Sequence, residues 1–212
     1  MTLIIFDCDG VLVDSEPITN AAISENLRRH GLDVSPDWCI ANFVGGTIAG
    51  VGEQARALGA DLPADWVEGM YEEMFAALRT RIEAVPGVAA AVDAVQAAGF
   101  ATCVASNGPR RKMEITLGAT GLMARFAGRI FTAHEVGVAK PDPGLFLHAA
   151  RTLGHAPGAC VVVEDSPSGA RAARRAGMRC LGYRGPMPEE KMRAEGAEMF
   201  SAMADLPGLL AR

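Results

Sequence analysis

A set of polar residues follows the ends of short apolar runs along the chain, and their types could do chemistry together. The set comprises Asp7, Asp9, Ser106, Asn107, Lys140, Glu164 and Asp165. Carboxylate oxygens are the ligands that hard divalent cations prefer, and ammonium, hydroxyl and amide groups can bind a phosphate group. Whether these side chains act together depends on the elements that carry them.

Short runs of β-branched and small apolar residues predict strands, and helical patterns separate most of them. The predicted strands are Leu3–Phe6, Ala101–Ala105, Arg129–Thr132, Cys160–Val163 and Cys180–Tyr183. The predicted helices between them are Val88–Ala98, Pro109–Thr120, Pro143–Leu153 and Pro167–Ala176. This alternation predicts an α/β fold with a Rossmann-like parallel sheet, covered by helices on both faces. Ligands bind beyond the carboxyl ends of such strands, so we expect the polar set to converge there.

A long helical segment interrupts the alternation after the first strand. Its predicted helices are one that ends at His30-Gly31, then Pro36–Phe43, Thr47–Leu58 and Pro63–Ile82. We therefore expect a core domain formed by residues 1–15 and 85–212, with an inserted all-helical domain of residues 16–84.

Asp7 and Asp9 are separated by one residue, so strand alternation should place their side chains on the same side. Two close carboxylates repel each other unless a cation lies with them. Asp165 would add a third oxygen ligand from another strand. An oxygen-only site with few protein ligands favours Mg²⁺, because Ca²⁺ requires more ligands.

Helices are predicted to begin near the same edge of the sheet. Pro109 and Pro167 each follow polar turn residues, which is typical of a helix N-terminus. The N–H groups and the positive dipole end of such helices favour a phosphate group. The Ser106 hydroxyl could bond a phosphoryl oxygen. Lys140, restricted by the following proline, could clamp a phosphate and neutralise the nucleophile.

Composition excludes several classes of protein. The chain has 20 basic and 25 acidic residues and a net charge of −5, which argues against binding to nucleic acid. The sequence shows no secretion signal and no apolar segment long enough to span a membrane, so we expect a cytoplasmic protein without a membrane partner. Its five cysteines lack metal-binding spacing and are expected to be reduced thiols.

Four segments carry a family resemblance. They are Phe6–Glu16, Ser106-Asn107-Gly108, Lys140-Pro141-Asp142-Pro143 and Glu164-Asp165-Ser166. In this order they resemble the four motifs of the haloacid dehalogenase-like (HAD) hydrolases. The helical insertion is similar to the cap domain of the phosphoglucomutase-like and small phosphatase subgroup, and the motifs resemble bacterial sugar-phosphate phosphatases, including a 6-phosphogluconate phosphatase type.

The resemblance implies a role for each residue of the polar set. Asp7 would attack phosphorus and form an aspartyl phosphate, and Asp9 would protonate the leaving oxygen and then activate water. Ser106, Asn107 and Lys140 would hold the phosphoryl oxygens. Mg²⁺ would be held by Asp7, the main-chain carbonyl of Asp9 and Asp165, with Glu164 nearby.

The sequence thus predicts a Mg²⁺-dependent phosphatase that acts, as a monomer or weak homodimer, on a small phosphorylated metabolite such as a sugar phosphate. Gly45-Gly46-Thr47 is the expected substrate loop of the cap. Three alternatives stay open: a phosphomutase, a catalytically silent phospho-ligand binder and a receiver-type switch. Mutase-type relatives carry a His and an Arg in the cap where this chain has Thr19-Asn20 and residues 44–48.

Overall fold

The structure is a computed structural model that describes residues 2–43, 47–185 and 188–211. The chain divides into two compact units. The core unit consists of Met1–Val13 and Ala84–Arg212, and the helical unit consists of Asp14–Glu83. These boundaries lie one or two residues before the expected ones.

A six-stranded parallel sheet forms the centre of the core unit, in the order β3-β2-β1-β4-β5-β6. The strands are β1 (Leu3–Phe6), β2 (Ala101–Ser106), β3 (Ile130–Thr132), β4 (Cys160–Glu164), β5 (Arg179–Tyr183) and β6 (Glu198–Phe200). The first five coincide with the predicted runs to within one or two residues. The predicted Rossmann-like α/β fold is therefore confirmed.

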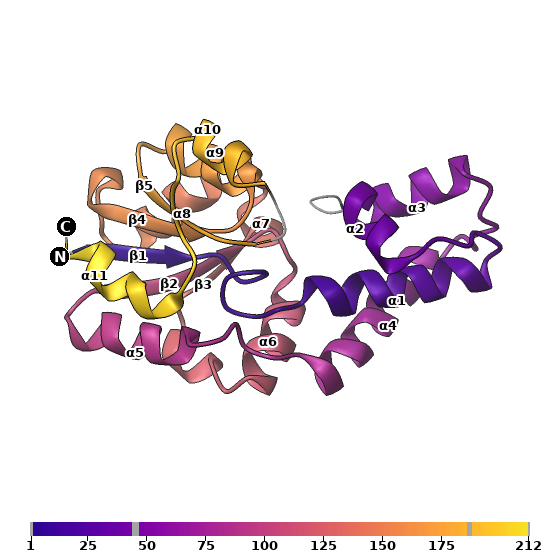
Figure 1. Ribbon diagram of the computed structural model, residues 1–212, viewed down its shortest axis with the longest axis horizontal. Helices are drawn as coiled ribbons and strands as arrows, with labels where there is room; N and C mark the ends of the chain where they lie inside the picture. Colours follow the sequence, from indigo (N-terminus) through magenta and orange to yellow (C-terminus); the bar gives the residue numbers. More distant parts are fainter. Residues whose placement is uncertain (1, 44–46, 186–187, 212) are drawn as a thin grey trace. The chain divides into compact units, whose positions relative to one another are not determined.

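Helices cover both faces of the sheet, as the continuous apolar strands require (Figure 1). Leu3 and Ile5 belong to an apolar cluster on one face, whereas the ring of Phe6 meets that of Phe126, with 5.8 Å between their centroids. The helices of the first face are α8 (Gly144–Thr152), α9 (Pro167–Arg175) and α10 (Glu189–Ala194). Those of the second face are α5 (Val88–Ala97), α6 (Arg110–Ala119) and α11 (Leu206–Leu210).

Several short elements were not predicted. They are α7 (Ala133–Val136), α10, β6, α11 and the 3₁₀ turns η1 (Met123–Phe126), η2 (Pro157–Ala159) and η3 (Met203–Asp205). Of these, α7 does have local signals, since Thr132 caps its start and Gly137 its end. The edge strand β6 has three residues, of which only Phe200 is buried. A run this short is too brief to show a periodicity, and β6 is defined by its pairing with β5.

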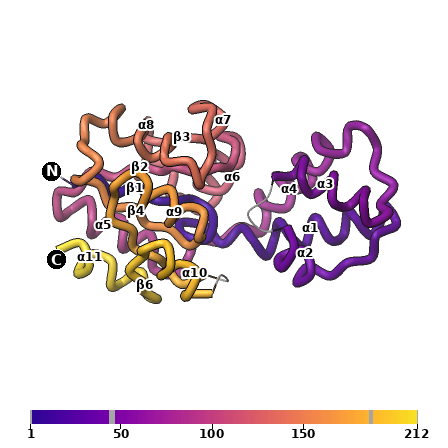
Figure 2. Tube along the Cα trace, turned by 90° about the horizontal axis from the view of Figure 1, so that it is seen from above, coloured from indigo at the N-terminus to yellow at the C-terminus, as the bar shows by residue number. Residues whose placement is uncertain are grey.

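The order of the strands reverses at β1, which pairs with β2 on one side and β4 on the other. The chain fills one side of the sheet with β2 and β3 and the other side with β4, β5 and β6. Such a reversal opens a crevice at the carboxyl ends of the strands. Asp7 follows β1 at this point, and its N–H donates to the carbonyl of Val163 at 2.9 Å. Figure 2 shows α11 near the opposite end of β1, where that strand begins.

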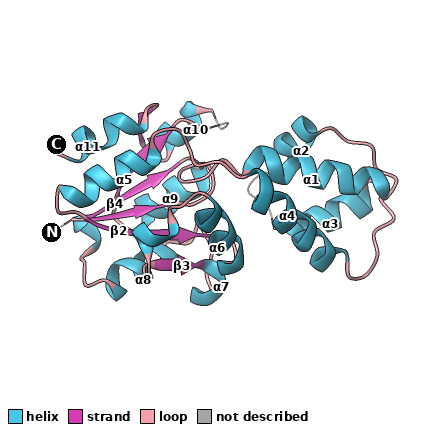
Figure 3. Ribbon diagram, turned by 90° about the horizontal axis from the view of Figure 1, so that it is seen from below, coloured by secondary structure: helices cyan, strands magenta, loops and turns pink. Residues whose placement is uncertain are grey.

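The described residues of the helical unit form helices joined by loops, with no strand (Figure 3). They are α1 (Glu16–Arg29), α2 (Pro36–Phe43), α3 (Ile48–Ala57) and α4 (Trp66–Arg81). Their apolar core includes a polar contact, since the Trp66 indole donates to Asn26 at 2.7 Å. Gly45 and Gly46 of the expected substrate loop lie outside the described residues. Thr47 caps α3, and its hydroxyl accepts a bond from the Gly50 N–H at 3.1 Å.

The segments that leave and re-enter the core unit run side by side. Val13 and Ala84 form an antiparallel bridge, and the Val85 N–H donates to the Leu12 carbonyl at 3.0 Å. The loop between β1 and this bridge turns at Gly10, whose φ of 75° favours glycine. This short pairing fixes the course of the chain immediately after Asp7 and Asp9.

Two further expectations concern the whole chain. None of the helices in the described ranges is long and apolar enough to cross a membrane. All five cysteines are free and buried, as expected for reduced thiols.

Candidate active site

Three buried carboxylates meet at the carboxyl end of β1. Ligand oxygens of Asp7, Glu164 and Asp165 lie within 4.8 Å of one another. Asp7 follows β1, Glu164 ends β4, and Asp165 begins the loop that leads into α9. The predicted convergence of residues from different strands therefore occurs for these three side chains.

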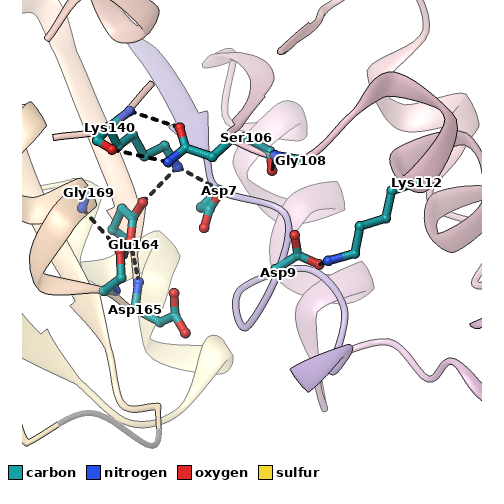
Figure 4. Close-up of polar contacts among 11 residues, drawn as sticks. Asp7, Asp9, Ser106, Gly108, Lys112, Lys140, Glu164, Asp165 and Gly169 are labelled. Carbon is teal, nitrogen blue, oxygen red and sulfur yellow. Dashed lines mark hydrogen bonds and ion pairs between the residues drawn. The ribbon is translucent and has the colours of Figure 1, made fainter. Parts of the chain in front are cut away.

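Lys140 is the cation of this group. Its ammonium lies 2.7 Å from Asp7 Oδ1 and 2.7 Å from Glu164 Oε1, and its side chain is only 4% exposed (Figure 4). The ammonium also lies 5.1 Å from the centroid of the Phe146 ring. Burial lowers the pKa of Lys140, but the two carboxylates outweigh burial and raise that pKa above its usual value. Lys140 therefore stays charged and joins the β1 and β4 sides of the site.

The pKa of Asp7 also depends on this group. Burial raises the pKa of Asp7 to about 7, Lys140 opposes this shift, and the charges of Glu164 and Asp9 add to it. Among the described residues, the group contains three carboxylates and the Lys140 ammonium, which contacts two of them, so negative charge is in excess. That excess, with oxygen donors from both Asp7 and Asp165, fits a divalent cation such as Mg²⁺.

Both carboxylate oxygens of Glu164 accept hydrogen bonds from other groups of the protein. Oε1 accepts from Lys140, and Oε2 accepts from the N–H groups of Asp165 and Ser166 at 3.0 and 2.8 Å. The Ser166 hydroxyl also donates to Oε2 at 2.8 Å. Glu164 is fully buried, and a β-carbon at Gly169 would overlap its carboxylate. This residue fixes the position of Lys140 and of the loop that carries Asp165.

Asp165 lies directly against main chain. A β-carbon at Gly10 would overlap its carboxylate, and one at Gly185 would lie 3.1 Å from Oδ2. The backbone of the loop after β1 can approach Asp165 this closely because residue 10 has no side chain. The loop that carries Asp7 and Asp9 is thereby held next to Asp165.

Ser106 ends β2 and Asn107 follows it, beside this group. The buried Ser106 hydroxyl accepts a bond from the Gly108 N–H at 3.0 Å, which leaves its own hydrogen to donate. The Asn107 amide bonds both main-chain groups of Lys140: it accepts from the N–H at 2.9 Å and donates to the carbonyl at 3.2 Å. One hydrogen of the amide is not used by these bonds, so the predicted contact of Asn107 with a phosphoryl oxygen stays a prediction.

Asp9 lies outside the group of three carboxylates. Its carboxylate forms an ion pair with Lys112, with 2.7 Å between Nζ and Oδ1 (Figure 4), and its charge is close enough to Asp7 to raise the pKa of that carboxyl group. The strand ends at Phe6, so strict alternation does not govern residues 7 to 9. The expected placement of both carboxylates on the same side stays a prediction, and Glu164 is the third carboxylate of the group with Asp7 and Asp165.

The comparisons with known proteins agree with this geometry. The model of the haloacid dehalogenase-like hydrolases, a hydrolase family, matches residues 1–177. The chain belongs to the haloacid dehalogenase-like hydrolases. The resemblance of the four motifs is thereby confirmed, and the two acidic segments and Lys140 all fall within the matched residues.

Similar proteins indicate which bond this HAD-like hydrolase cleaves. It is 29% identical over 208 residues to 6-phosphogluconate phosphatase of Escherichia coli K12, covering 97% of this chain and 93% of that protein. It is 33% identical over 186 residues to hexitol phosphatase A of the same organism, covering 86% and 82%. A crystal structure of a HAD family hydrolase from Deinococcus radiodurans R1, with bound phosphate and sodium, superposes with a TM-score of 0.83 at 30% identity. That match covers 100% of this chain and 95% of the other. The protein is a HAD-like phosphoric monoester hydrolase.

Sequence reasoning missed one charged residue of the hydrolase site, Lys112. It lies in the first turn of α6, which begins where β2 ends. The sequence does contain a signal: a helix that starts beside the carboxyl ends of the strands carries its first-turn side chains there. The direction of the Lys112 side chain, however, becomes visible only in the folded chain.

Proposed function

We propose that the protein is a Mg²⁺-dependent phosphatase that hydrolyses a small phosphorylated metabolite, a sugar phosphate, through an aspartyl phosphate on Asp7. The observation that carries this proposal is the buried group of Asp7, Glu164 and Asp165, bridged by Lys140 at the strand reversal. A fixed carboxylate next to a buried cation suits attack on a phosphate ester, because positioning and charge neutralisation dominate phosphoryl transfer.

In the first half-reaction, Asp7 attacks phosphorus while the bond from phosphorus to the ester oxygen breaks. Asp9 gives its proton to that oxygen, so the product leaves as an alcohol. Lys140 neutralises charge on the phosphoryl oxygens, and the Ser106 hydroxyl donates a hydrogen bond to one of them. In the second half-reaction, Asp9 takes a proton from water as water attacks the phosphoryl group and releases Asp7.

Asp7, Asp165 and the main-chain carbonyl of Asp9 would hold Mg²⁺. When bound, the ion offsets the repulsion between the carboxylates and the incoming phosphate. Both oxygens of Glu164 already accept bonds from the protein, so this proposal gives Glu164 a supporting position rather than a place among the ligands.

The sugar-phosphate class rests on the two phosphatase relatives, whose names refer to a phosphorylated sugar acid and to hexitol. The helical unit, as a cap, would select the leaving group. The segment 45–47 stays our predicted substrate loop.

The test is a panel of phosphorylated sugars, sugar acids and polyols, assayed for released inorganic phosphate with and without Mg²⁺. We expect Mg²⁺-dependent turnover of at least one ester. Turnover by Asp7→Asn should be below about 1% of wild type, since removal of a covalent nucleophile costs several orders of magnitude in rate. Asp61→Asn, at an exposed position of the helical unit, is the matched control and should match wild type.

Two results would contradict the proposal. Undiminished phosphate release by Asp7→Asn would exclude Asp7 as the nucleophile. Conversion of a sugar phosphate into an isomer without phosphate release would identify a mutase instead.

A further inference from the structure

The first turn of α6 breaks a local rule of helix design. Arg110, Arg111 and Lys112 are consecutive cations there, and no acidic residue accompanies them in that turn. Cations at a helix N-terminus oppose the helix dipole and reduce the stability of the helix. Such departures are expected where a residue serves a site rather than its own helix.

Arg110 has a structural explanation outside the site, whereas Lys112 does not. Arg110 forms an ion pair with the exposed carboxylate of Glu135. It also donates a hydrogen bond to the carbonyl of Ile130, with 2.8 Å between Nη2 and the oxygen. Lys112 is mostly buried, with 14% of its side chain exposed, and its partner is Asp9 at 2.7 Å. Burial lowers the pKa of Lys112, but Asp9 outweighs it and raises that pKa above its usual value.

Packing of α6 fixes where Lys112 points. Thr116 lies one turn further along the same helix face and is fully buried. Its Oγ1 lies 3.9 Å from the Sγ of buried Cys8, the residue between the two aspartates. This face of α6 therefore lies against the loop of residues 7 to 9, and Lys112 reaches Asp9 from a rigid element.

The Asp9 carboxylate lies at the edge of the phosphoryl site. A β-carbon at Gly108 would be 3.4 Å from Ser106 Oγ and 3.7 Å from Asp9 Oδ2. Gly108 thus separates the hydroxyl assigned to the phosphoryl group from the second oxygen of Asp9. Lys112 holds Oδ1, and Oδ2 lies on the side that faces Gly108 and Ser106.

We propose that Lys112 is a positioning residue of the reaction, whose ammonium holds Asp9 Oδ1 so that Oδ2 exchanges the proton at the phosphoryl site. This inference rests on the proposed phosphatase activity. The Lys112 ammonium keeps its own protons throughout. In the first half-reaction the proton moves from Asp9 to the leaving oxygen, and in the second a proton of water moves to Asp9.

The test compares wild type, Lys112→Met and Lys112→Arg on two substrates. One is an alkyl ester, such as a sugar phosphate found in the panel, whose poor leaving group needs the proton. The other is 4-nitrophenyl phosphate, whose leaving group needs almost none. Lys191→Met, at an exposed position of α10, is the matched control and should leave both activities unchanged.

We expect Lys112→Met to lower kcat/KM for the alkyl ester by about 10- to 100-fold, which is below the roughly 10²- to 10⁴-fold typical of a general acid itself because Asp9 stays in place, and to lower that for the nitrophenyl ester much less. Hydrolysis of the phosphoenzyme should also slow, because Asp9 acts there as the base. Rapid mixing with 4-nitrophenyl phosphate should then show a burst of nitrophenol close to one equivalent per enzyme. Lys112→Arg should restore most of the lost rate.

The outcomes separate the two proposals. If wild type hydrolyses neither ester, the proposed function fails. If wild type is active and Lys112→Met equals it on both esters without a burst, only the role of Lys112 is overturned. The role is also overturned if the loss is confined to the alkyl ester and the phosphoenzyme decays at the wild-type rate, because Lys112 would then bind the leaving group directly.

Discussion

Two lysines at the same edge of the sheet contact carboxylates at equal distances but in different surroundings. Lys140 lies 2.7 Å from Asp7 and from Glu164, and the three side chains are 4%, 11% and 0% exposed. Lys112 lies 2.7 Å from Asp9, and these two side chains are 14% and 25% exposed. We refer to the group of Lys140, Asp7 and Glu164 as the buried pair side. We refer to the pair of Lys112 and Asp9 as the open pair side.

The difference matches the work proposed for each aspartate. A nucleophile has to be held in one place, and the buried pair side achieves this through the bonds of Asn107 to Lys140 and of Glu164 to its own loop. A group that gives a proton and later takes one from water needs access to solvent, which the open pair side retains. Burial thus gives two chemically similar carboxylates different surroundings, as their two proposed roles require.

Lys140→Met should produce the largest loss of stability. It leaves Asp7 and Glu164 buried without their cation, and removal of one partner of a buried ion pair typically costs about 3–5 kcal/mol. Urea unfolding of the full-length protein, in a chelating buffer near neutral pH, measures this loss of unfolding free energy. The same substitution at exposed Lys191 should change the free energy of unfolding by less than about 0.5 kcal/mol.

The comparison would be wrong if the two substitutions had the same effect. A loss at Lys140 as small as that at Lys191 would mean that water reaches the buried pair side as freely as the surface. Mg²⁺ offers a second check: because a cation can take over part of the neutralisation, adding it should stabilise Lys140→Met more than wild type.

Gly169→Ala should rank second. A β-carbon there would overlap the Glu164 carboxylate, and overpacking in a buried region typically costs about 1–3 kcal/mol. Gly118 in α6 is the matched control, since its β-carbon would meet nothing within 4 Å. Gly118→Ala should stabilise the protein by about 0.5–1 kcal/mol through helix propensity. Equal effects of the two substitutions, measured by urea unfolding, would show that the position of Glu164 can shift without cost.

Sequence pattern predicts the buried pair side better than the open one. The strands around Asp7 and Glu164 are apolar on both faces, so their ends are visible as a switch from apolar to polar residues. In a parallel sheet those ends must meet at one edge. The contact of Lys140 with this edge followed from its rigid setting before a proline and from the family resemblance.

The open pair side depends on side-chain direction, which no local pattern encodes. The strand ends at Phe6, so strand alternation does not set the direction of the Asp9 side chain. The contact of Lys112 arises from packing of α6 across more than a hundred residues of chain, as Cys8 and Thr116 illustrate. The short strand β6 depends in the same way on tertiary structure, because it is defined by its pairing with β5.

Lys112→Met should have the smallest effect on stability of the three site substitutions, although it should impair catalysis. Its pair with Asp9 keeps contact with solvent, and such pairs contribute about 1 kcal/mol or less. Salt provides the discriminating measurement. Screening acts on charges that solvent reaches, so 1 M NaCl should reduce the difference between Lys112→Met and wild type in urea unfolding, while the difference for Lys140→Met should persist. If salt reduced both differences equally, burial would not distinguish the two lysines, and the assignment of a fixed nucleophile and a solvent-accessible proton carrier would lose its physical basis.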